Sequence, residues 1–420
     1  MSPPADDKRP RRKTPLTMRA AALRVVQQLQ SRGFVALFAG GCVRDMLMGR
    51  DPHDYDVATS AKPQDVIGLF RRTAHVGAKF GVVLVRIGRH SIEVATFRAD
   101  GSYSDGRRPD AVTFTTPEED ACRRDFTING MFFDPVAEAV VDHVGGQADL
   151  AAKLIRAIGD PEQRFAEDHL RLLRAVRFAA RLGFQIEPET WAAMCRHASD
   201  ITRVSPERVR MELEEILLHA RRTQAVEMLH DAGLLAYLWP GAEVLQANIQ
   251  RITKALAALP PVAPFELGLA ALLLPLSIDE ASSACAALRC SNATEETVCW
   301  LLTKLPTLAQ PAALSLADVK RLMAHAAFDD LLALFAATLA ADGRDPAPLA
   351  ELKARAADIT PEDVAPPPLL TGHDLQQLHL PPGPRYRRIL NHVYDAQLNE
   401  DIRDRGEAIN MARRLADETD

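Results

Sequence analysis

The 420-residue sequence predicts an α+β domain at the N-terminus and an all-helical remainder. Two observations support this division. Between residues 20 and 150, short buried or alternating apolar runs interrupt the helical patterns, whereas beyond residue 150 the apolar positions keep a helical spacing. Proline-rich breaks at 258–264 and 365–368 divide the helical half further. We therefore predict a disordered basic tail (1–19), an α+β head (20–150), and a helical neck (151–230), body (231–360) and C-terminal tail (361–420).

The head is expected to start with a helix over residues 20–30, where apolar residues recur at helical spacing before Gly33. A buried strand and a short helix follow, separated by the pair Gly40 and Gly41. A second strand, a helix that begins near Pro63, and two alternating runs joined by a turn complete a mixed sheet with helices. The predicted strands are 34–41, 54–61, 81–88 and 91–98, and the predicted helices between them are 42–49 and 63–70.

Composition excludes several classes of protein. Hydrophobic residues make up 47% and charged residues 25% of the chain, which excludes collagen-like and wholly disordered chains. The 50 Lys and Arg against 56 Asp and Glu give a net charge of −6, so any contact with nucleic acid must come from a local patch. Six scattered cysteines without a CxxC pair predict a cytoplasmic protein without a zinc framework. No apolar run approaches the roughly 20 residues that span a bilayer, so no membrane contact is expected.

The first candidate site combines the glycine pair with two acids. Gly40 and Gly41 end a strand and begin a helix, so their backbone N–H groups form a candidate anion site, to which Arg44 could add a forked contact. Asp54 and Asp56 follow on the next strand, where residues two apart share a face. Adjacent carboxylates repel unless a cation lies between them, so the pair predicts a Mg²⁺ site. The alternative is that Asp54 and Asp56 are two surface carboxylates that lie close together by chance and bind no metal.

Glu93 is a candidate third carboxylate. Alternation along residues 91–98 places it on one face with Ala95 and Phe97. A glutamate on an interior strand is unfavourable unless it is paired or bound to a metal, which favours a role beside the two aspartates. A solvent-facing glutamate on an edge strand explains the sequence equally well.

Arginines dominate two later segments. Arg123 and Arg124 precede Asp125, which is expected to cap a helix, and the two arginines could hold a triphosphate while Asn129 holds a sugar hydroxyl or the fold. A capped helix with solvated arginines is the alternative for this segment. Plotted on one helix, residues 167–181 separate an apolar face from a ridge of arginines. The ridge starts beside Asp168 and contains Arg171, Arg174, Arg177 and Arg181. A solvated charged face is the alternative, but arginine without lysine favours recognition of phosphate and base edges.

Together these motifs resemble the class II tRNA nucleotidyltransferases, a family that includes the bacterial CCA-adding enzymes and the related poly(A) polymerases. The resemblance rests on FAGGCVRDMLMGRDPHDYDVAT, IEVATFRADGSYSDGRRPDAV, EEDACRRDFTINGM and EDHLRLLRAVRFAARLGF, in this order between residues 38 and 184. The later segment TGHDLQQLHLPPGPRYRRIL is similar to the C-terminal segment of the family, less sharply. The resemblance implies a polymerase-beta-like nucleotidyltransferase head followed by the helical neck, body and tail.

The resemblance also implies individual roles. By position, Asp54 and Asp56 match metal-binding carboxylates, Gly41, Arg44 and Arg124 match nucleotide contacts, Asp168 and Arg171 match the base-selecting pair, and Arg174 and Arg177 match further nucleotide contacts. A carboxylate only accepts hydrogen bonds and a guanidinium only donates them. Such a pair suits the edges of cytosine and adenine, and it leaves mismatched polar contacts with uracil and guanine.

The implied activity is template-independent addition of C, C and A to the 3′ end of tRNA from CTP and ATP. The 3′-hydroxyl would attack the α-phosphate in line, with Mg²⁺ as cofactor and pyrophosphate as leaving group. A Gly-rich loop at 98–109 resembles the loop that accompanies the switch from C to A in the family, which argues against an enzyme that adds C alone. The segment 76–82 lacks the Arg-rich run typical of poly(A) polymerases.

Three alternatives stay open: an A-adding enzyme, a poly(A) polymerase, and a non-catalytic RNA-binding protein on the same scaffold. The expected partners are the acceptor end of tRNA, ATP and CTP, and no protein partner is indicated. Candidate phosphate contacts for the RNA are Arg203, Arg208, Arg210, Arg221, Arg222, Arg385, Arg387 and Arg388.

Overall fold

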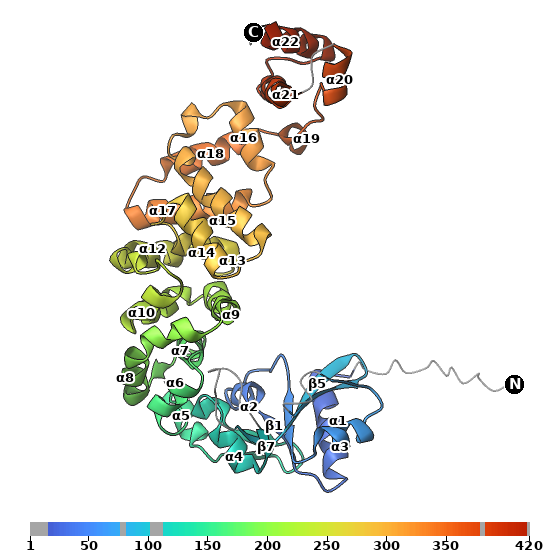
Figure 1. The fold of residues 1–420 in the computed structure, drawn as a ribbon, viewed down its shortest axis with the longest axis vertical. Coiled ribbons are helices and arrows are strands. Elements are labelled where there is room, and N and C mark those ends of the chain that lie inside the picture. Colours follow the sequence, from blue (N-terminus) through green and yellow to red (C-terminus); the bar gives the residue numbers. More distant parts are fainter. Residues whose placement is uncertain (1–15, 76–80, 101–111, 379–382, 418–420) are drawn as a thin grey trace, which may run out of the picture. The chain divides into compact units, whose positions relative to one another are not determined.

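The computed structural model describes residues 16–75, 81–100, 112–378 and 383–417. Its backbone forms two compact units, Met1–Ser205 and Pro206–Asp420 (Figure 1). Most of the predicted N-terminal tail, residues 76–80 of the segment 76–82, and most of the predicted loop at 98–109 lie outside the described residues. Helix α1 (Met18–Gln30) begins inside the segment predicted as tail, because the Thr17 hydroxyl caps it by accepting the Ala20 N–H at 3.2 Å.

A seven-stranded mixed sheet forms the centre of the first unit, in the order β3-β4-β5-β2-β1-β8-β9. The neighbours β2 and β5 are parallel, and the other neighbouring pairs are antiparallel. Its strands are β1 (Ala36–Ala39), β2 (Asp56–Thr59), β3 (Thr73–His75), β4 (Val82–Ile87), β5 (His90–Thr96), β8 (Phe132–Asp134) and β9 (Ala139–Val141). The predicted mixed sheet with helices is confirmed.

Register between the parallel strands brings two candidate acids together. Val57 of β2 lies opposite Val94 of β5. The preceding residues, Asp56 and Glu93, are therefore neighbours on the same face. Because β5 lies between β4 and β2, Glu93 is on an interior strand and not on an edge strand. Its side chain is exposed, as the solvent-facing part of the alternative expected.

Helices cover the two faces of the sheet unequally. Helices α1 and α3 (Pro63–Leu69) pack on one face, where Val25 and Val66 share a buried cluster with Val57 and Val94 (Figure 1). The opposite face has a smaller cluster, which includes Phe97 and Phe132 and to which α4 (Pro117–Cys122) contributes Ala121. Helix α2 (Gly41–Leu47) starts where β1 ends.

The rest of the first unit is mostly helical. Two short strand pairs interrupt it, β6–β7 and the parallel pair β10–β11. The second pair contradicts the all-helical prediction locally, since two-residue strands give no periodic signal. The bounds are β6 (Arg98–Asp100), β7 (Val112–Phe114), α5 (Gly146–Ala152), β10 (Leu154–Ile155), α6 (Pro161–Glu167), α7 (Arg171–Leu182), β11 (Gln185–Ile186) and α8 (Pro188–Arg196).

All regular elements described in the second unit are helices, as predicted. They are α9 (Pro206–Leu218), α10 (Arg222–Asp231), α11 (Val244–Ala247), α12 (Ile249–Ala258), α13 (Phe265–Leu272), α14 (Ile278–Ala287), α15 (Asn292–Lys304), α16 (Leu316–Met323), α17 (Phe328–Asp342), α18 (Ala347–Ala357), α19 (Pro361–Val364), α20 (Gly372–Gln377), α21 (Pro384–Leu398) and α22 (Arg405–Asp417), with short 3₁₀ turns between some of them. Among the described residues no single helix is long and apolar enough to cross a membrane, and only the pair α16 and α17, bent by 107°, reaches that length and composition together.

Arg222 is not available for the predicted RNA contact. Its side chain is buried, and its guanidinium donates to the carbonyl oxygens of Pro260 at 3.0 Å and Pro261 at 2.7 Å. These carbonyls belong to a proline-rich break, where no helix supplies N–H partners for them. Arg222 therefore stabilises the connection between α12 and α13.

Candidate active site

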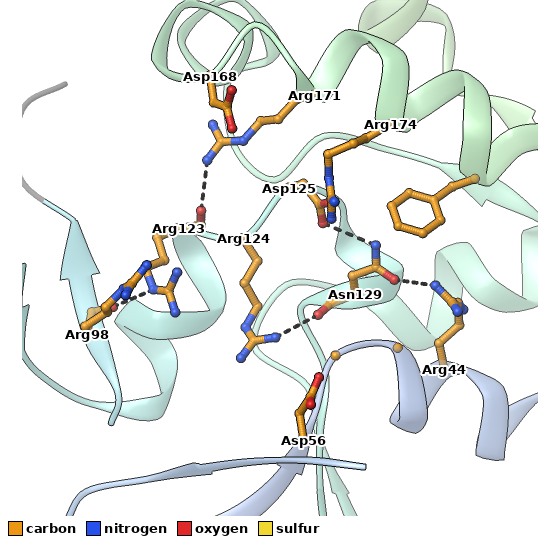
Figure 2. A pocket seen from close by; sticks show the side chains of 13 residues that line it. Arg44, Asp56, Arg98, Arg123, Arg124, Asp125, Asn129, Asp168, Arg171 and Arg174 are labelled. Atoms are coloured by element: carbon orange, nitrogen blue, oxygen red, sulfur yellow. Dashed lines mark hydrogen bonds and ion pairs between the residues drawn. The ribbon is translucent and has the colours of Figure 1, made fainter. Parts of the chain in front are cut away.

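A cavity of about 430 Å³ opens in the first unit, and arginine side chains from several elements surround it (Figure 2). Most of the predicted nucleotide-binding residues and Asp56 line it, whereas Asp54, Glu93 and Arg177 are not part of its lining. The described lining consists of Gly40, Gly41, Arg44, Asp56, Arg98, Arg123, Arg124, Asp125, Asn129, Asp168, Arg171, Arg174 and Phe178. The cavity is therefore strongly positive, which suits an anionic ligand.

The glycine pair allows side chains to approach the backbone closely. Gly40 has a φ of 72°, a conformation that favours glycine, and it connects β1 to α2. A Cβ on Gly40 would lie 3.2 Å from Nη1 of Arg124, and one on Gly41 would lie 3.6 Å from Nη2 of Arg44. The pair thus places bare backbone between two guanidinium groups.

Two carboxylates on neighbouring strands, Asp56 in the cavity lining and Glu93 outside it, have raised pKa values. Burial and the charges of Glu93 and Asp54 raise the pKa of Asp56 to about 6, and nearby Arg124 opposes the shift. Burial and Asp54 likewise raise the pKa of Glu93, against the influence of Arg98. The side chain of Asp56 is nevertheless open to solvent on one side, so a cation can reach it.

Asp54 lies outside the strand, contrary to the prediction. Pairing of β1 with β2 ends at Ala39 and Asp56, because the chain turns at Gly40 into α2. Asp54 therefore approaches Asp56 from a loop rather than from the same strand face. Across the described ranges, no three His, Cys, Asp or Glu side chains form a ready-made metal site, so the metal ligands remain a prediction.

Asp120 anchors the arginine pair, a role that the sequence interpretation missed. The residue is 1% exposed and lies one turn before the pair, on α4. Its Oδ1 accepts from Nε and Nη2 of Arg123 at 2.9 and 2.7 Å, and its Oδ2 accepts from Nε and Nη2 of Arg124 at 3.2 and 3.0 Å. The two guanidinium groups hold the pKa of Asp120 below its usual range, despite burial. The sequence did carry a signal for this contact, because Asp120 precedes Arg123 and Arg124 by three and four residues, the spacings at which side chains on a helix meet.

Asp125 holds a third arginine, Arg174, and does not cap a helix as expected. The 3₁₀ turn Thr127–Asn129 begins after Phe126 and has no side-chain cap. Instead, Oδ2 of Asp125 accepts from Nε and Nη2 of Arg174 at 2.9 and 2.6 Å, which lowers the pKa of Asp125. Its Oδ1 accepts from the Asn129 amide at 3.2 Å, and the Asn129 oxygen accepts from Nη1 of Arg44 at 2.7 Å (Figure 2).

The predicted continuous helix over residues 167–181 is broken. Helix α6 ends at Glu167, Asp168 has an extended backbone, and α7 begins at Arg171. Oδ1 of Asp168 accepts the Leu170 N–H at 3.1 Å, so this side chain competes with helical hydrogen bonding. The break directs Asp168 and Arg171 into the cavity together (Figure 2).

Arg171 has a carboxylate partner that the sequence interpretation did not assign. Its Nη1 donates to Oε2 of Glu167 and to the Arg164 carbonyl, both at 2.7 Å, and its Nη2 donates to the Arg123 carbonyl at 3.1 Å. The residue is 6% exposed. These contacts fix its guanidinium beside Asp168. The Glu–Arg spacing of four residues could have indicated the pair.

Phe178 is a further lining residue that sequence reasoning missed. The guanidinium carbons of Arg44, Arg174 and Arg177 lie 5.5, 5.3 and 4.7 Å from the centre of its ring. Phe126 contacts the ring edge-on, with centroids 5.9 Å apart. Cation–π contacts of this kind hold the arginines without using their N–H groups. Arg177 is thus placed behind the ring, outside the lining.

Two protein families match parts of this sequence. The family "Poly A polymerase head domain" matches residues 36–156, and "Probable RNA and SrmB- binding site of polymerase A" matches residues 183–245. The first match contains the sheet, the glycine pair and the arginine pair. The cavity therefore lies mainly in the part of the chain that resembles polymerase heads.

The similar proteins are CCA-adding enzymes. A CCA-adding enzyme of Geobacillus stearothermophilus is 34% identical over 390 residues, which are 92% of this chain and 95% of the relative. A CCA-adding enzyme of Geobacillus kaustophilus is 44% identical over 237 residues, 56% of this chain and 57% of the relative. The crystal structure of the Bacillus stearothermophilus CCA-adding enzyme in complex with CTP matches with a TM-score of 0.77 and 30% identity, over 95% of this chain and 98% of that one. The chain therefore belongs to the family of class II nucleotidyltransferases that contains the CCA-adding enzymes and poly(A) polymerases.

Proposed function

We propose that this chain adds C, C and A to the 3′ end of tRNA, using CTP and ATP and releasing pyrophosphate. The observation that carries the proposal is the cavity, where an Asp–Arg pair lies together with Asp56 and a set of arginines. A CCA-adding enzyme that matches 92% of the chain supports the same activity.

We assign the arginine side of the cavity to the nucleotide. Arg44 and Arg124 stand beside the glycine pair and can donate to triphosphate oxygens, while Arg174 stands on the far side against Phe178. Charge-assisted hydrogen bonds of this type are the strong ones for phosphate. These groups bind and orient the nucleotide so that its α-phosphate faces the three carboxylates.

We assign base selection to Asp168 and Arg171. The bonds of Arg171 to Glu167, Arg164 and Arg123 use three of its five N–H hydrogens, which leaves two for a ligand. Beside them, the Asp168 carboxylate can accept from an exocyclic amino group. Cytosine and adenine offer an amino donor beside a ring acceptor, whereas uracil and guanine offer the reverse. The pair therefore selects C and A without a nucleic-acid template.

We assign Asp54 and Asp56 as ligands of Mg²⁺, with Glu93 as a third carboxylate beside them. Their donor chemistry fits a hard cation, because burial and the charges of neighbouring acids raise the pKa values of Asp56 and Glu93, and a positive charge beside them would stabilise their ionised forms. When bound, Mg²⁺ neutralises triphosphate charge and lowers the pKa of an attacking hydroxyl. The reaction itself is in-line attack of the RNA 3′-oxygen on the α-phosphate, which breaks the bond to the bridging oxygen of pyrophosphate.

The tRNA acceptor end is the proposed partner, held by the neck, body and tail segments as predicted from the sequence. Arg203, Arg221, Arg387 and Arg388 are exposed and keep their candidacy as phosphate contacts. Such contacts should weaken as salt concentration rises.

Purified protein, Mg²⁺ and tRNA transcripts that end before CCA, after C and after CC test the proposal. Each transcript receives CTP, ATP or both, and products are resolved at single-nucleotide length. Ordered growth to CCA followed by arrest is expected. Extension of the CC-ended transcript alone by one A would instead identify an A-adding enzyme, long A tails a poly(A) polymerase, and no extension with retained RNA binding a non-catalytic protein.

A further inference from the structure

Asp120 is a buried acid that touches no open part of the cavity, yet it contacts both arginines of the pair. Besides its four bonds to Arg123 and Arg124, its Oδ1 accepts the Arg98 N–H at 3.2 Å. Nε of Arg123 also donates to the Arg98 carbonyl at 2.9 Å. Both oxygens of Asp120 are therefore occupied by charged or backbone donors from the cavity wall.

The contact leaves Arg124 in a defined orientation. Nε and Nη2 face Asp120, so Nη1 is the nitrogen directed to the glycine pair, where it lies 3.4 Å from the Asn129 carbonyl oxygen. The guanidinium carbon also lies 4.9 Å from the centre of the Phe132 ring. Arg124 is thus held from one edge, and its other edge faces the cavity.

A second set of acids lies within the electrostatic reach of Arg124. Figure 2 shows its guanidinium beside Asn129 and above Asp56, and its charge acts on the Asp56 carboxylate. Asp54 and Glu93 add negative charge to the same place. An Arg124 side chain released from Asp120 would therefore find an ion pair on the catalytic side of the cavity.

We propose that Asp120 is a positioning residue, which holds Arg124 against the cavity wall for the nucleotide and keeps it from pairing with Asp56. The inference rests on the proposed role of Arg124 in nucleotide binding. Asp56 then faces the reacting groups, whereas Asp120 sets the position of an arginine. A purely structural role for Asp120 would affect folding without affecting nucleotide affinity.

The test is a double-mutant cycle on CTP binding, measured by equilibrium titration in EDTA so that no metal and no turnover are involved. The proteins are the full chain with Asp120→Asn, Arg124→Gln, and both changes. Asp120→Asn should weaken CTP binding by about tenfold, as expected when a charge-assisted phosphate contact is misplaced. Arg124→Gln should weaken binding at least as much, and the double variant should match Arg124→Gln alone, since Asp120 acts through Arg124.

Thermal unfolding of each variant separates positioning from folding, with Asp149→Asn as the matched control. Asp149 is also a buried acid paired with an arginine, Arg156 at 3.0 Å, but it lies away from the cavity lining. The control should lose stability and keep CTP affinity. Asp120→Glu, which keeps the charge but displaces the carboxylate, replaces Asp120→Asn if the latter does not fold.

Unchanged CTP affinity in a folded Asp120 variant, while Arg124→Gln weakens binding, would overturn this inference alone. Additive effects in the double variant would also overturn it, because Asp120 would then act without Arg124. Unchanged affinity in Arg124→Gln would remove the proposed nucleotide role of Arg124, and the inference would fall with it.

Discussion

Asp56 and Asp125 are carboxylates of one cavity, but their pKa values move in opposite directions. Burial and the negative charges of Glu93 and Asp54 raise the pKa of Asp56 to about 6. Asp125 is bonded to Arg174, and its pKa falls below the usual range. The same functional group therefore has two uses. Asp54, Asp56 and Glu93 form a negative patch that attracts a cation. Asp120 and Asp125 are bonded to arginines and build the positive wall of the cavity.

Burial alone does not distinguish the two groups, since it raises the pKa in both. What distinguishes them is the chain segment that supplies them. The patch comes from the start of β2 and its parallel neighbour β5, where the register aligns Asp56 with Glu93. The wall comes from the turn after α4 and from α7, where acids and arginines are bonded pairwise.

Removing an acid of the patch should have the largest effect on activity. Asp56→Asn is expected to slow nucleotide incorporation by at least about 100-fold, because it removes charge stabilisation at the reacting phosphate. The melting temperature should stay the same or rise, since like-charge repulsion is relieved. Single-turnover incorporation and thermal unfolding measure the two effects. Retained incorporation would contradict the assignment of Asp56.

Removing an acid of the wall should act first on stability. Asp125→Asn leaves the partly buried Arg174 without its charged partner, so the free energy of unfolding should fall by about 2–3 kcal/mol, as for a hydrogen bond to a charged group. CTP affinity should fall as well, because Arg174 loses its orientation. Denaturant unfolding and CTP titration test the two parts. A variant as stable as the wild type would show that the Asp125–Arg174 pair does not stabilise this wall.

A third change affects selection rather than binding. Arg171→Ala should reduce the preference for CTP and ATP over UTP and GTP by about tenfold or more, because two donors to the base edge are lost. Arg181→Ala is the matched control, since Arg181 lies on the same helix and outside the cavity lining. Incorporation from each of the four nucleotides measures the preference. The same preference in Arg171→Ala and the control would refute the assignment.

Much of the patch was predictable because its signals are local. The strand, the glycine pair and the following helix appear in the sequence as a buried run, a break and a short helical pattern. Alternation on β5 correctly separated Glu93 from the buried residues Ile92 and Val94. The loop position of Asp54 was not predictable, because it depends on where pairing with β1 ends.

The wall was harder to predict because its bonds connect segments far apart in the chain. The contact of Asp125 with Arg174 spans 49 positions, so no periodic pattern reports it. The break at Asp168 also escaped detection, since the apolar spacing continues through it and does not report that the Asp168 side chain accepts the Leu170 N–H. Asp120 and Glu167 did leave a local signal, an acid three or four residues before an arginine.

The smallest predicted effect is on the pH dependence of stability, where the two groups of acids should oppose each other. The folded protein holds a proton on Asp56 more tightly than the unfolded chain, whose pKa is near the ordinary 3.8. The contribution of Asp56 to stability is therefore complete below pH 3.8 and is lost as the pH rises to about 6. Asp125 has the opposite sign, since its contribution is present above its ordinary pKa of 3.8 and is lost as the pH falls through its lowered value.

The comparison of wild type with Asp56→Asn isolates the first contribution. Because Asp56 is open to solvent, screening limits the effect to about 1 kcal/mol, or about 2–4 °C in melting temperature for a unit of this size. The variant should gain stability relative to the wild type as the pH rises from about 4 to about 6.5, with a plateau above. Thermal unfolding across this range at constant ionic strength measures the difference. A difference that is constant with pH would mean that neither burial nor the charges of Glu93 and Asp54 raise the pKa of Asp56 in the folded chain, and the patch would lose its main argument as a cation site.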